Sequence, residues 1–265
     1  MSTMPDRNGK RPDAQAVMRR AIILAHIFVK AASTPPAVHL KQWMTAWSPE
    51  DKQKCLDEFK DRFATQESKL KEAGLWDHMV EEERVFMQAG PLETTDRHQV
   101  DASWSVESIM CLQWALGRLD RFPHYDEQVH PETVKFEPGV RAHALIGQAT
   151  LRPAAEIDRQ RDLAEAWHWR ARTHRLLKEN KIPPVLENGL TMADVIRLSA
   201  GEAARSGGFD FPLAEDYIVF GKPFREISDE EFDSVMSICG ERHKALNWLC
   251  GYAPGNQWNK TPTHT

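Results

Sequence analysis

The residues best suited to chemistry are charged and imidazole side chains on otherwise apolar helix faces. The stretch 228–252 reads SDEEFDSVMSICGERHKALNWLCGY, and Ser228 with Glu231 has the pattern of a capping box. At 100° per residue, Arg242 and His243 fall on the apolar face of this helix. That face is formed by Phe232, Val235, Met236, Cys239, Leu246 and Cys250. Because an unpaired buried guanidinium is costly, Arg242 predicts a carboxylate partner from elsewhere in the chain.

The segment 151–178, LRPAAEIDRQRDLAEAWHWRARTHRLLK, supplies a second polar set. Helical spacing aligns an apolar stripe there and places Arg161 and His168 beside it. The stripe consists of Ile157, Ala164, Trp167 and Ala171. Acids of the same segment, namely Asp158, Asp162 and Glu165, are therefore the first candidates for the partner of Arg242.

These two segments define one candidate site, for which two interpretations stay open. Its members are Arg161, Asp162, His168, Glu241, Arg242, His243, Asn247 and Trp248. In the structural interpretation, a buried ion-pair network fixes two helices against each other. In the functional one, Arg242 is a bidentate clamp for the carboxylate or phosphate of a small anionic ligand.

Other kinds of site find little support in the sequence. The chain has no HExxH or paired HxxxH motif, and His168 and His174 point to different faces of a helix, so we expect no metal. A GxSxG elbow, a P-loop and a GxGxxG loop are absent, so no cofactor is predicted. The four cysteines form no CxxC pair, which favours a reducing compartment.

Charge and hydropathy exclude further classes of partner. The net charge of −5 and the lack of a Lys/Arg block argue against nucleic-acid binding. The apolar run AIILAHIFV at 21–29 is too short to span a membrane, and His26 interrupts it. We therefore expect a buried core helix, no membrane partner and a cytoplasmic location.

The elements that must position these residues are helices. The pattern predicts a mainly α protein: a single compact multi-helix domain with at most a short strand or hairpin near residues 216–224. Residues 1–12 are expected to be a flexible N-terminus and 13–265 a single helical domain. Predicted helices cover 13–32, about 49–73, 75–88, a central segment from about 103 to 119, 151–178, a stretch from 191 and 228–250.

The C-terminal string Glu241-Arg-His-Lys-Ala-Leu-Asn-Trp-Leu249 resembles the end of the domain of unknown function 4272 family. Segments 104–116, 151–163 and 219–224 are similar to that family too, so the resemblance covers roughly residues 75–265. It implies a mostly helical, bacterial-type intracellular domain with no established reaction, and it carries over no catalytic residues. Asn259 and His264 depart from the acids typical of the family's tail.

By elimination, the sequence favours a non-catalytic binding or interaction protein, of an inhibitor or immunity type. The alternative is an enzyme with a dispersed site, in which Arg242 holds a small anionic substrate and His243 or His168 is the general acid–base. The partner expected is a protein or a small anionic ligand. An open pocket beside Arg242 would favour the enzyme, and a sealed Arg242 would favour the binding protein.

Overall fold

The computed structural model describes residues 9–133, 141–206 and 215–264, and it is mainly helical with one two-stranded sheet in that part of the chain. The helices are α1 (Ala14–Ala32), α2 (Ala37–Trp43), α3 (Pro49–Glu72), α4 (Glu81–Gln88), α5 (Asp96–Ala115), α6 (Ala142–Gly147), α7 (Ala154–Lys178), α8 (Met192–Arg205) and α9 (Asp229–Leu249). The strands are β1 (Ile218–Val219) and β2 (Lys222–Pro223). Short 3-10 turns occupy Met44–Ala46, Trp76–His78, Pro131–Thr133, Phe224–Glu226, Pro254–Asn256 and Trp258–Lys260. The predicted fold class is confirmed.

Local chemistry sets the starts of the long helices. Asp13, Ser48, Thr191 and Ser228 each accept a hydrogen bond from a backbone amide of the first turn, as N-caps do. Ser228 and Glu231 form the predicted capping box at α9, where the Ser228 amide donates to the Glu231 carboxylate at 2.7 Å. These ends therefore need no tertiary contact to be defined.

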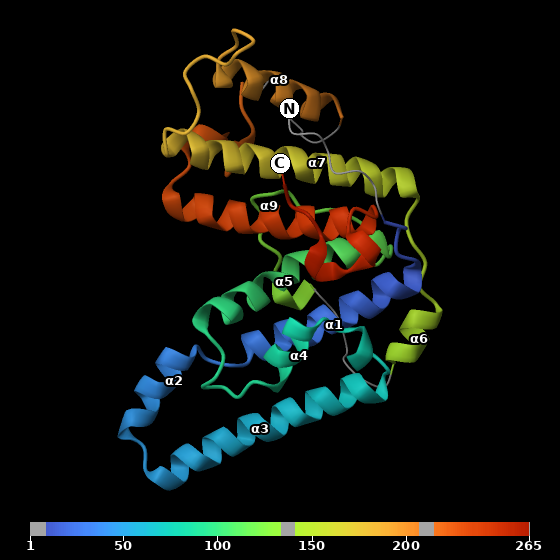
Figure 1. Cartoon of the computed structure of the whole chain (residues 1–265), viewed down its shortest axis with the longest axis vertical. Coiled ribbons are helices and arrows are strands. Elements are labelled where there is room, and N and C mark those ends of the chain that lie inside the picture. Colours follow the sequence, from blue (N-terminus) through green and yellow to red (C-terminus); the bar gives the residue numbers. More distant parts are fainter. Residues whose placement is uncertain (1–8, 134–140, 207–214, 265) are drawn as a thin grey trace.

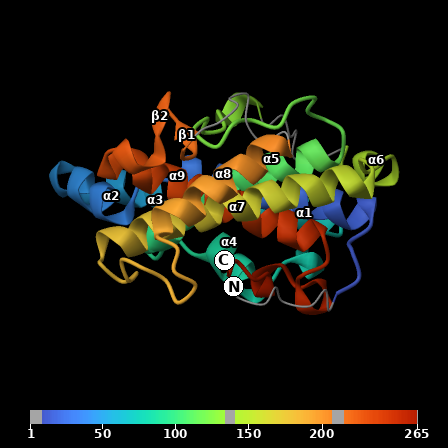
Figure 2. The same ribbon diagram turned by 90° about the horizontal axis from the view of Figure 1, so that it is seen from above.

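The helices stack in layers around α5 (Figure 1). α5 packs against α1 on one side and α9 on the other, α7 covers α9, and α8 packs on α7. α3 and α4 lie on the far side of α1 (Figure 1). Seen from above, α2 and α6 lie at opposite ends of the molecule (Figure 2).

The core follows from this layering. Residues 105–116 of α5 are buried around the whole circumference of the helix, because a neighbouring helix lies on each side. Buried apolar side chains from α1 to α9 join in one cluster. Burial of such surface is the main favourable term in folding.

The most apolar helical stretch belongs to this core. By length and composition alone, one segment, 14–46, contains a window that could cross a membrane. In the structure 61% of that window is buried, and α1 packs against α5. This is the packing predicted for a core helix.

The extended segment near 216–224 forms the predicted hairpin. β1 and β2 are antiparallel, with Ile218 opposite Pro223 and Val219 opposite Lys222. Phe220 and Gly221 both have positive φ, 51° and 74°, which fits a type I′ turn. The hairpin is fixed to α7, where Arg170 donates to both carboxylate oxygens of Asp216 at 2.6 and 2.7 Å.

Some elements differ from the prediction. α5 begins at Asp96 and not near 103, because Thr95 caps it by accepting from the His98 amide. Segment 75–88 divides into a 3-10 turn and α4, and neither α2 nor α6 was predicted. Both missed helices are short, seven and six residues, so they carry little periodic signal.

Part of the N-terminus predicted to be flexible is described. Residues 1–8 lie outside the described part. Gly9 donates its amide to the Gly251 carbonyl at 3.0 Å, and Arg11 pairs with Asp158 of α7. A Cβ at Gly9 would lie 2.6 Å from the Ala253 carbonyl oxygen, so this close approach requires glycine.

Candidate functional site

Arg242 is completely buried and is paired with an acid that the sequence analysis did not propose. Its Nε donates to Glu107 Oε2 at 2.9 Å, and both side chains are 0% exposed. Glu107 belongs to α5, so the expectation of a partner from α7 was wrong. The reason is that α9 packs against both α5 and α7, and Arg242 faces α5.

Three of the four remaining N–H donors of Arg242 bind carbonyls of one loop. Nη1 donates to the carbonyls of Pro123 and His124 at 2.8 and 2.9 Å, and Nη2 donates to that of Glu127 at 2.7 Å. The second Glu107 oxygen accepts from the Val129 amide at 2.8 Å. The pair therefore fastens the loop 122–129 to the core, and Arg242 lines none of the hollows described below.

A second network joins α7 to α9 and contains four predicted residues. Arg161 Nε donates to Asn247 Oδ1 at 2.7 Å, and Asn247 Nδ2 donates to His243 Nε2 at 2.9 Å. The Nδ1 atoms of His243 and His168 are 2.9 Å apart. Because His243 accepts at Nε2, its proton lies on Nδ1 and is donated to His168.

Burial keeps both imidazoles neutral. It lowers the pKa of His168 to about 4, and Arg172 and Arg175 add to the effect. It lowers the pKa of His243 to about 3, with a further contribution from His168 and Arg161. A neutral pair can relay a hydrogen bond, and it carries no positive charge with which to hold an anion.

The other predicted members lie apart from this network or at its edge. Arg161 Nη1 lies 2.7 Å from a Glu165 oxygen and 3.2 Å from one of Asp162, whose side chain is 69% exposed. Glu241 accepts from the Ser108 hydroxyl at 2.7 Å. Trp248 Nε1 donates to the Asn256 carbonyl at 3.0 Å and packs edge-on against Trp258.

Two hollows open beside these helices. One, of about 280 Å³, is lined by Asp101, Trp104, His168, Met236, Ser237, Gly240, Glu241, Lys244 and Thr263. His168 and Glu241 are thus the predicted site residues that reach an open space.

The second hollow is a larger groove of about 690 Å³, which shares Asp101 and Lys244 with the first. α4, α5 and the 3-10 turn at Trp258 contribute most of its lining. Its apolar residues are Ile27, Val80, Val85, Phe86, Ala89, Ala102 and Trp258, and its acids are Glu81, Glu82, Glu83, Glu93 and Asp101.

The acid that pairs with Arg242 and the walls of the groove were not among the predicted site residues. Glu107 carried a signal, since it is an acid inside the apolar run 106–112, and Arg170 lies three residues after Trp167 of the apolar stripe. The groove had no such signal, because its walls come from segments far apart in the chain. Among the described residues, no group of His, Cys, Asp and Glu could hold a metal ion.

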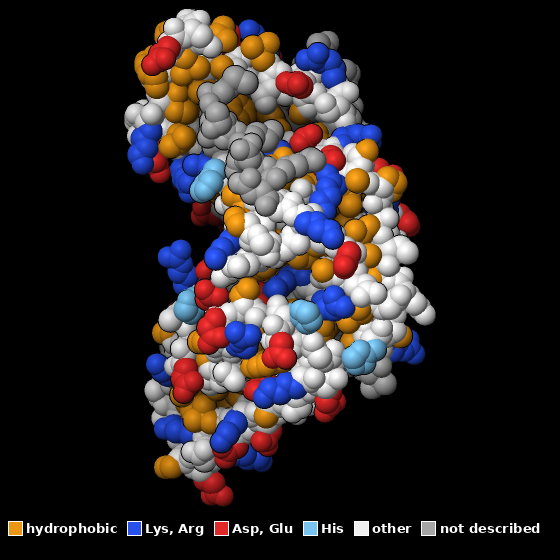
Figure 3. All heavy atoms as spheres, turned by 45° about the vertical axis from the view of Figure 1, so that its right-hand side comes forward, with side chains coloured by type: hydrophobic (Ala, Val, Ile, Leu, Met, Phe, Trp, Pro, Cys, Tyr) orange, Lys and Arg blue, Asp and Glu red, His pale blue; other side chains and the backbone are white. Residues whose placement is uncertain are grey.

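Charges on the face shown in Figure 3 are interspersed, with lysines and arginines lying among acids.

No curated protein and no solved structure matches the chain significantly. A family model, described as a domain of unknown function (DUF4272), matches residues 5–193. The match includes segments 104–116 and 151–163 and ends before the string 241–249 that carried the resemblance. Since the match covers more than half of the chain, this protein belongs to the domain of unknown function 4272 family.

Proposed function

We propose that this chain is a non-catalytic binding protein that holds a basic, amphipathic segment of a partner protein in the groove between α4, α5 and the turn at Trp258. The observation that carries the proposal is this apolar groove of about 690 Å³ with an acidic rim. An inhibitor or immunity-type role is one form of such a function. The proposed location is the cytoplasm, which agrees with four free thiols.

The apolar lining suits the buried face of a helix. Phe86 and Trp258 provide aromatic surface, and Val85 is 57% exposed although it lies in the groove. Aromatic residues in a groove are typical anchors of protein interfaces. Because the groove and the hollow beside His168 adjoin at Asp101 and Lys244, an elongated segment could contact both.

The rim suits a cationic partner. Glu82 meets no cation at ion-pair distance among the described residues and contacts the Asn259 amide at 3.4 Å. Asp101 lies 3.8 Å from the exposed Arg97, which is a weak pair. The one lysine of the lining, Lys244, lies over the Trp258 ring at 5.2 Å. Two other lining acids, Glu81 and Glu83, are paired with Arg84 and Arg20. The acids left for a partner, namely Glu82, Glu93 and Asp101, still outnumber the one lysine of the lining, so the groove would attract lysines and arginines of a partner.

The sealed environment of Arg242 supports a binding protein over the dispersed enzyme. A guanidinium whose donors are taken by Glu107 and the loop 122–129 has no position for a substrate anion. One observation favours the enzyme: His168 and Glu241 line the same open hollow of about 280 Å³. A small molecule that stabilises the wild type and loses its effect in His168→Gln would favour that alternative.

Fluorescence anisotropy with a labelled helical peptide of leucine and lysine tests the proposal. We expect saturable binding to the wild type and no binding of the matching leucine and glutamate peptide. Glu82→Lys should weaken binding about three- to tenfold, since it reverses one exposed charge. Val85→Ser should weaken it by about fivefold through lost apolar contact.

Matched substitutions outside the groove provide the control. Val38→Ser and Glu58→Lys change exposed residues of α2 and α3 in the same way. They should leave the dissociation constant unchanged within twofold. If groove and control variants behave alike, the peptide binds by general charge attraction and the proposal is rejected.

A further inference from the structure

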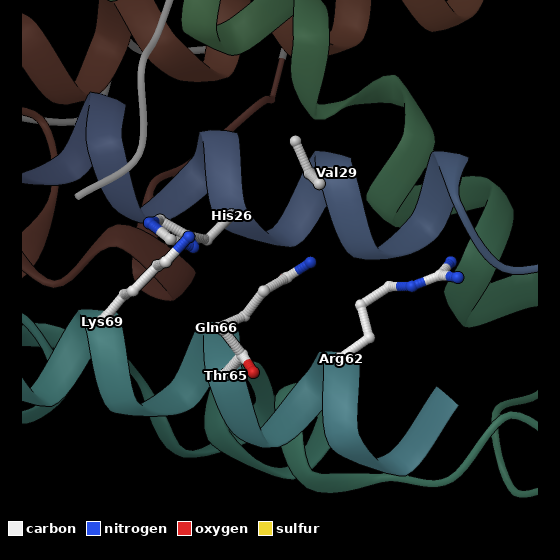
Figure 4. A pocket seen from close by; sticks show the side chains of 6 residues that line it. All are labelled: His26, Val29, Arg62, Thr65, Gln66 and Lys69. Atoms are coloured by element: carbon white, nitrogen blue, oxygen red, sulfur yellow. The ribbon is translucent and has the colours of Figure 1, made fainter. Parts of the chain in front are cut away.

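A separate hollow of about 290 Å³ lies between α1 and α3, on the other side of α1 from α5. His26 and Val29 of α1 line it from one side, and Arg62, Thr65, Gln66 and Lys69 of α3 from the other (Figure 4). Figure 4 shows Lys69 pointing toward His26, and Gln66 reaching toward α1. Apart from Val29, the lining residues are polar or charged.

His26 is a buried polar group without a partner. Its side chain is only 3% exposed, and no hydrogen bond or ion pair of its ring is found among the described residues. Gln66 Oε1 is also buried with no hydrogen-bond partner in that part of the chain. A neutral imidazole without a partner at the edge of a hollow has one N–H free to donate to an acceptor in that space.

The charges that face His26 are positive. Burial, and after it the Lys69 ammonium, lowers the pKa of His26 to about 4, so the ring is neutral and can donate one N–H. Lys69 forms no ion pair with a described residue, and Arg62 makes only a long hydrogen bond of 3.4 Å to the Ser33 carbonyl. The nearby Glu67 carboxylate forms an ion pair with Lys71 at 2.6 Å.

The cations bracket the hollow. Arg62 and Lys69 are seven residues apart on α3, which is about 10.5 Å along a helix. Thr65 and Gln66 lie between them and provide a hydroxyl and an amide. Figure 4 shows Lys69 and His26 together at one end of the hollow and the Arg62 guanidinium directed toward the other end. An ammonium beside neutral donors is a usual environment of a bound carboxylate or phosphate, and a second cation at the far end adds to the positive potential of the space.

We propose that the hollow between α1 and α3 binds a small oxyanion, a phosphate or carboxylate group, held by Lys69 and His26, with Arg62 adding positive charge at the other end of the hollow. The site is distinct from the groove at α4 and does not depend on the function proposed for that groove. A small anionic ligand was expected from the sequence at Arg242, and this hollow has the open cations that Arg242 lacks.

Thermal unfolding with added anions tests the site. Inorganic phosphate, sulfate and malonate are compared with sodium chloride at equal ionic strength, so that general salt effects cancel. We expect at least one of the three oxyanions to raise the melting temperature in a saturable manner. The tighter ligand, phosphate or malonate, then identifies the group that the site prefers.

Exposed residues allow variants that should still fold. Arg62→Gln with Lys69→Gln should weaken oxyanion binding at least tenfold, because both charges are removed. Lys54→Gln with Lys60→Gln makes the same change of net charge elsewhere on exposed positions of α3 and should leave the affinity unchanged. NMR signals of the His26 ring should shift during the titration of the wild type.

Three results would overturn the proposal. The first is equal stabilisation by chloride and by all three oxyanions. The second is retention of oxyanion affinity in Arg62→Gln with Lys69→Gln, and the third is an unchanged His26 signal at saturating ligand. None of these results bears on the groove, which is tested with a peptide.

Discussion

Arg242 illustrates how one residue can be buried with its charge fully used inside the fold. The Glu107 carboxylate and three loop carbonyls take its donors, and the guanidinium carbon lies 5.1 Å from the centre of the Tyr125 ring. Breaking a buried ion pair leaves the other charge uncompensated, so the pair is costly to disrupt whatever its net contribution. At this scale the residue supports folding and not ligand capture.

We predict that Arg242→Met lowers the free energy of unfolding by about 3–5 kcal/mol, because Glu107 then keeps a buried charge without a partner. Urea denaturation provides the measurement. Arg84→Met removes a half-exposed partner of Glu81 and should cost under about 1 kcal/mol. A similarly small loss for Arg242→Met would show that the buried pair does not hold the loop 122–129.

The pair of helices α7 and α9 is joined by side chains that must stay neutral. His168 and His243 meet through their Nδ1 atoms, and Asn247 links them to Arg161. Aromatic contacts extend the same interface, since Trp167 of α7 stacks on Tyr125 with ring centres 5.0 Å apart. The helix interface therefore combines apolar packing with one hydrogen-bonded chain.

We predict that acid weakens this interface. The pKa of His168 falls from 6.5 to about 4 on folding, so the unfolded chain binds protons first as the pH decreases. The stabilising contribution is complete above pH 6.5 and is lost as the pH falls to about 4. At 1.36 kcal/mol per unit of pKa difference, the loss is roughly 3 kcal/mol.

Unfolding free energies measured between pH 7 and pH 4 check this prediction. His168→Asn should show a flatter pH dependence than the wild type, and His130→Asn, at an exposed position, should not. His26 is present in all three proteins, so a difference between their pH dependences reports on the pair of His168 and His243. Parallel curves for the wild type and His168→Asn would contradict the prediction.

The whole molecule is packed unevenly. α5 lies between α1 and α9 in the middle of the stack, whereas α3 lies at its edge (Figure 1). Of the 24 residues of α3, only Phe63 and Leu70 are buried. Elements with few buried contacts open locally at low free energy, so stability should decrease from α5 toward α3.

Amide hydrogen exchange should reveal this gradient. We predict that the amides of α3 exchange at least about a hundredfold faster than those of residues 105–116 in α5, because opening α3 exposes little apolar surface. Mass spectrometry of peptides from both helices provides the comparison. Equal protection of the two helices would mean that α3 unfolds only with the whole molecule.

The sequence by itself determined the elements whose signals are local. Caps at Asp13, Ser48, Thr191 and Ser228 and apolar periodicity defined α1, α3, α8 and α9, because these interactions involve residues a few positions apart. It also indicated that Arg242 needed an acid. The hairpin followed from an isolated extended segment with glycine at the turn.

Only the tertiary structure decided which residues meet. Glu107 lies 135 positions from Arg242, and the groove and the hollow at His26 are built from separate helices. Helical periodicity specifies which face of a helix is buried, and it does not specify which helix covers that face. Packing placed Arg242 against α5 and left Lys69 of α3 facing His26.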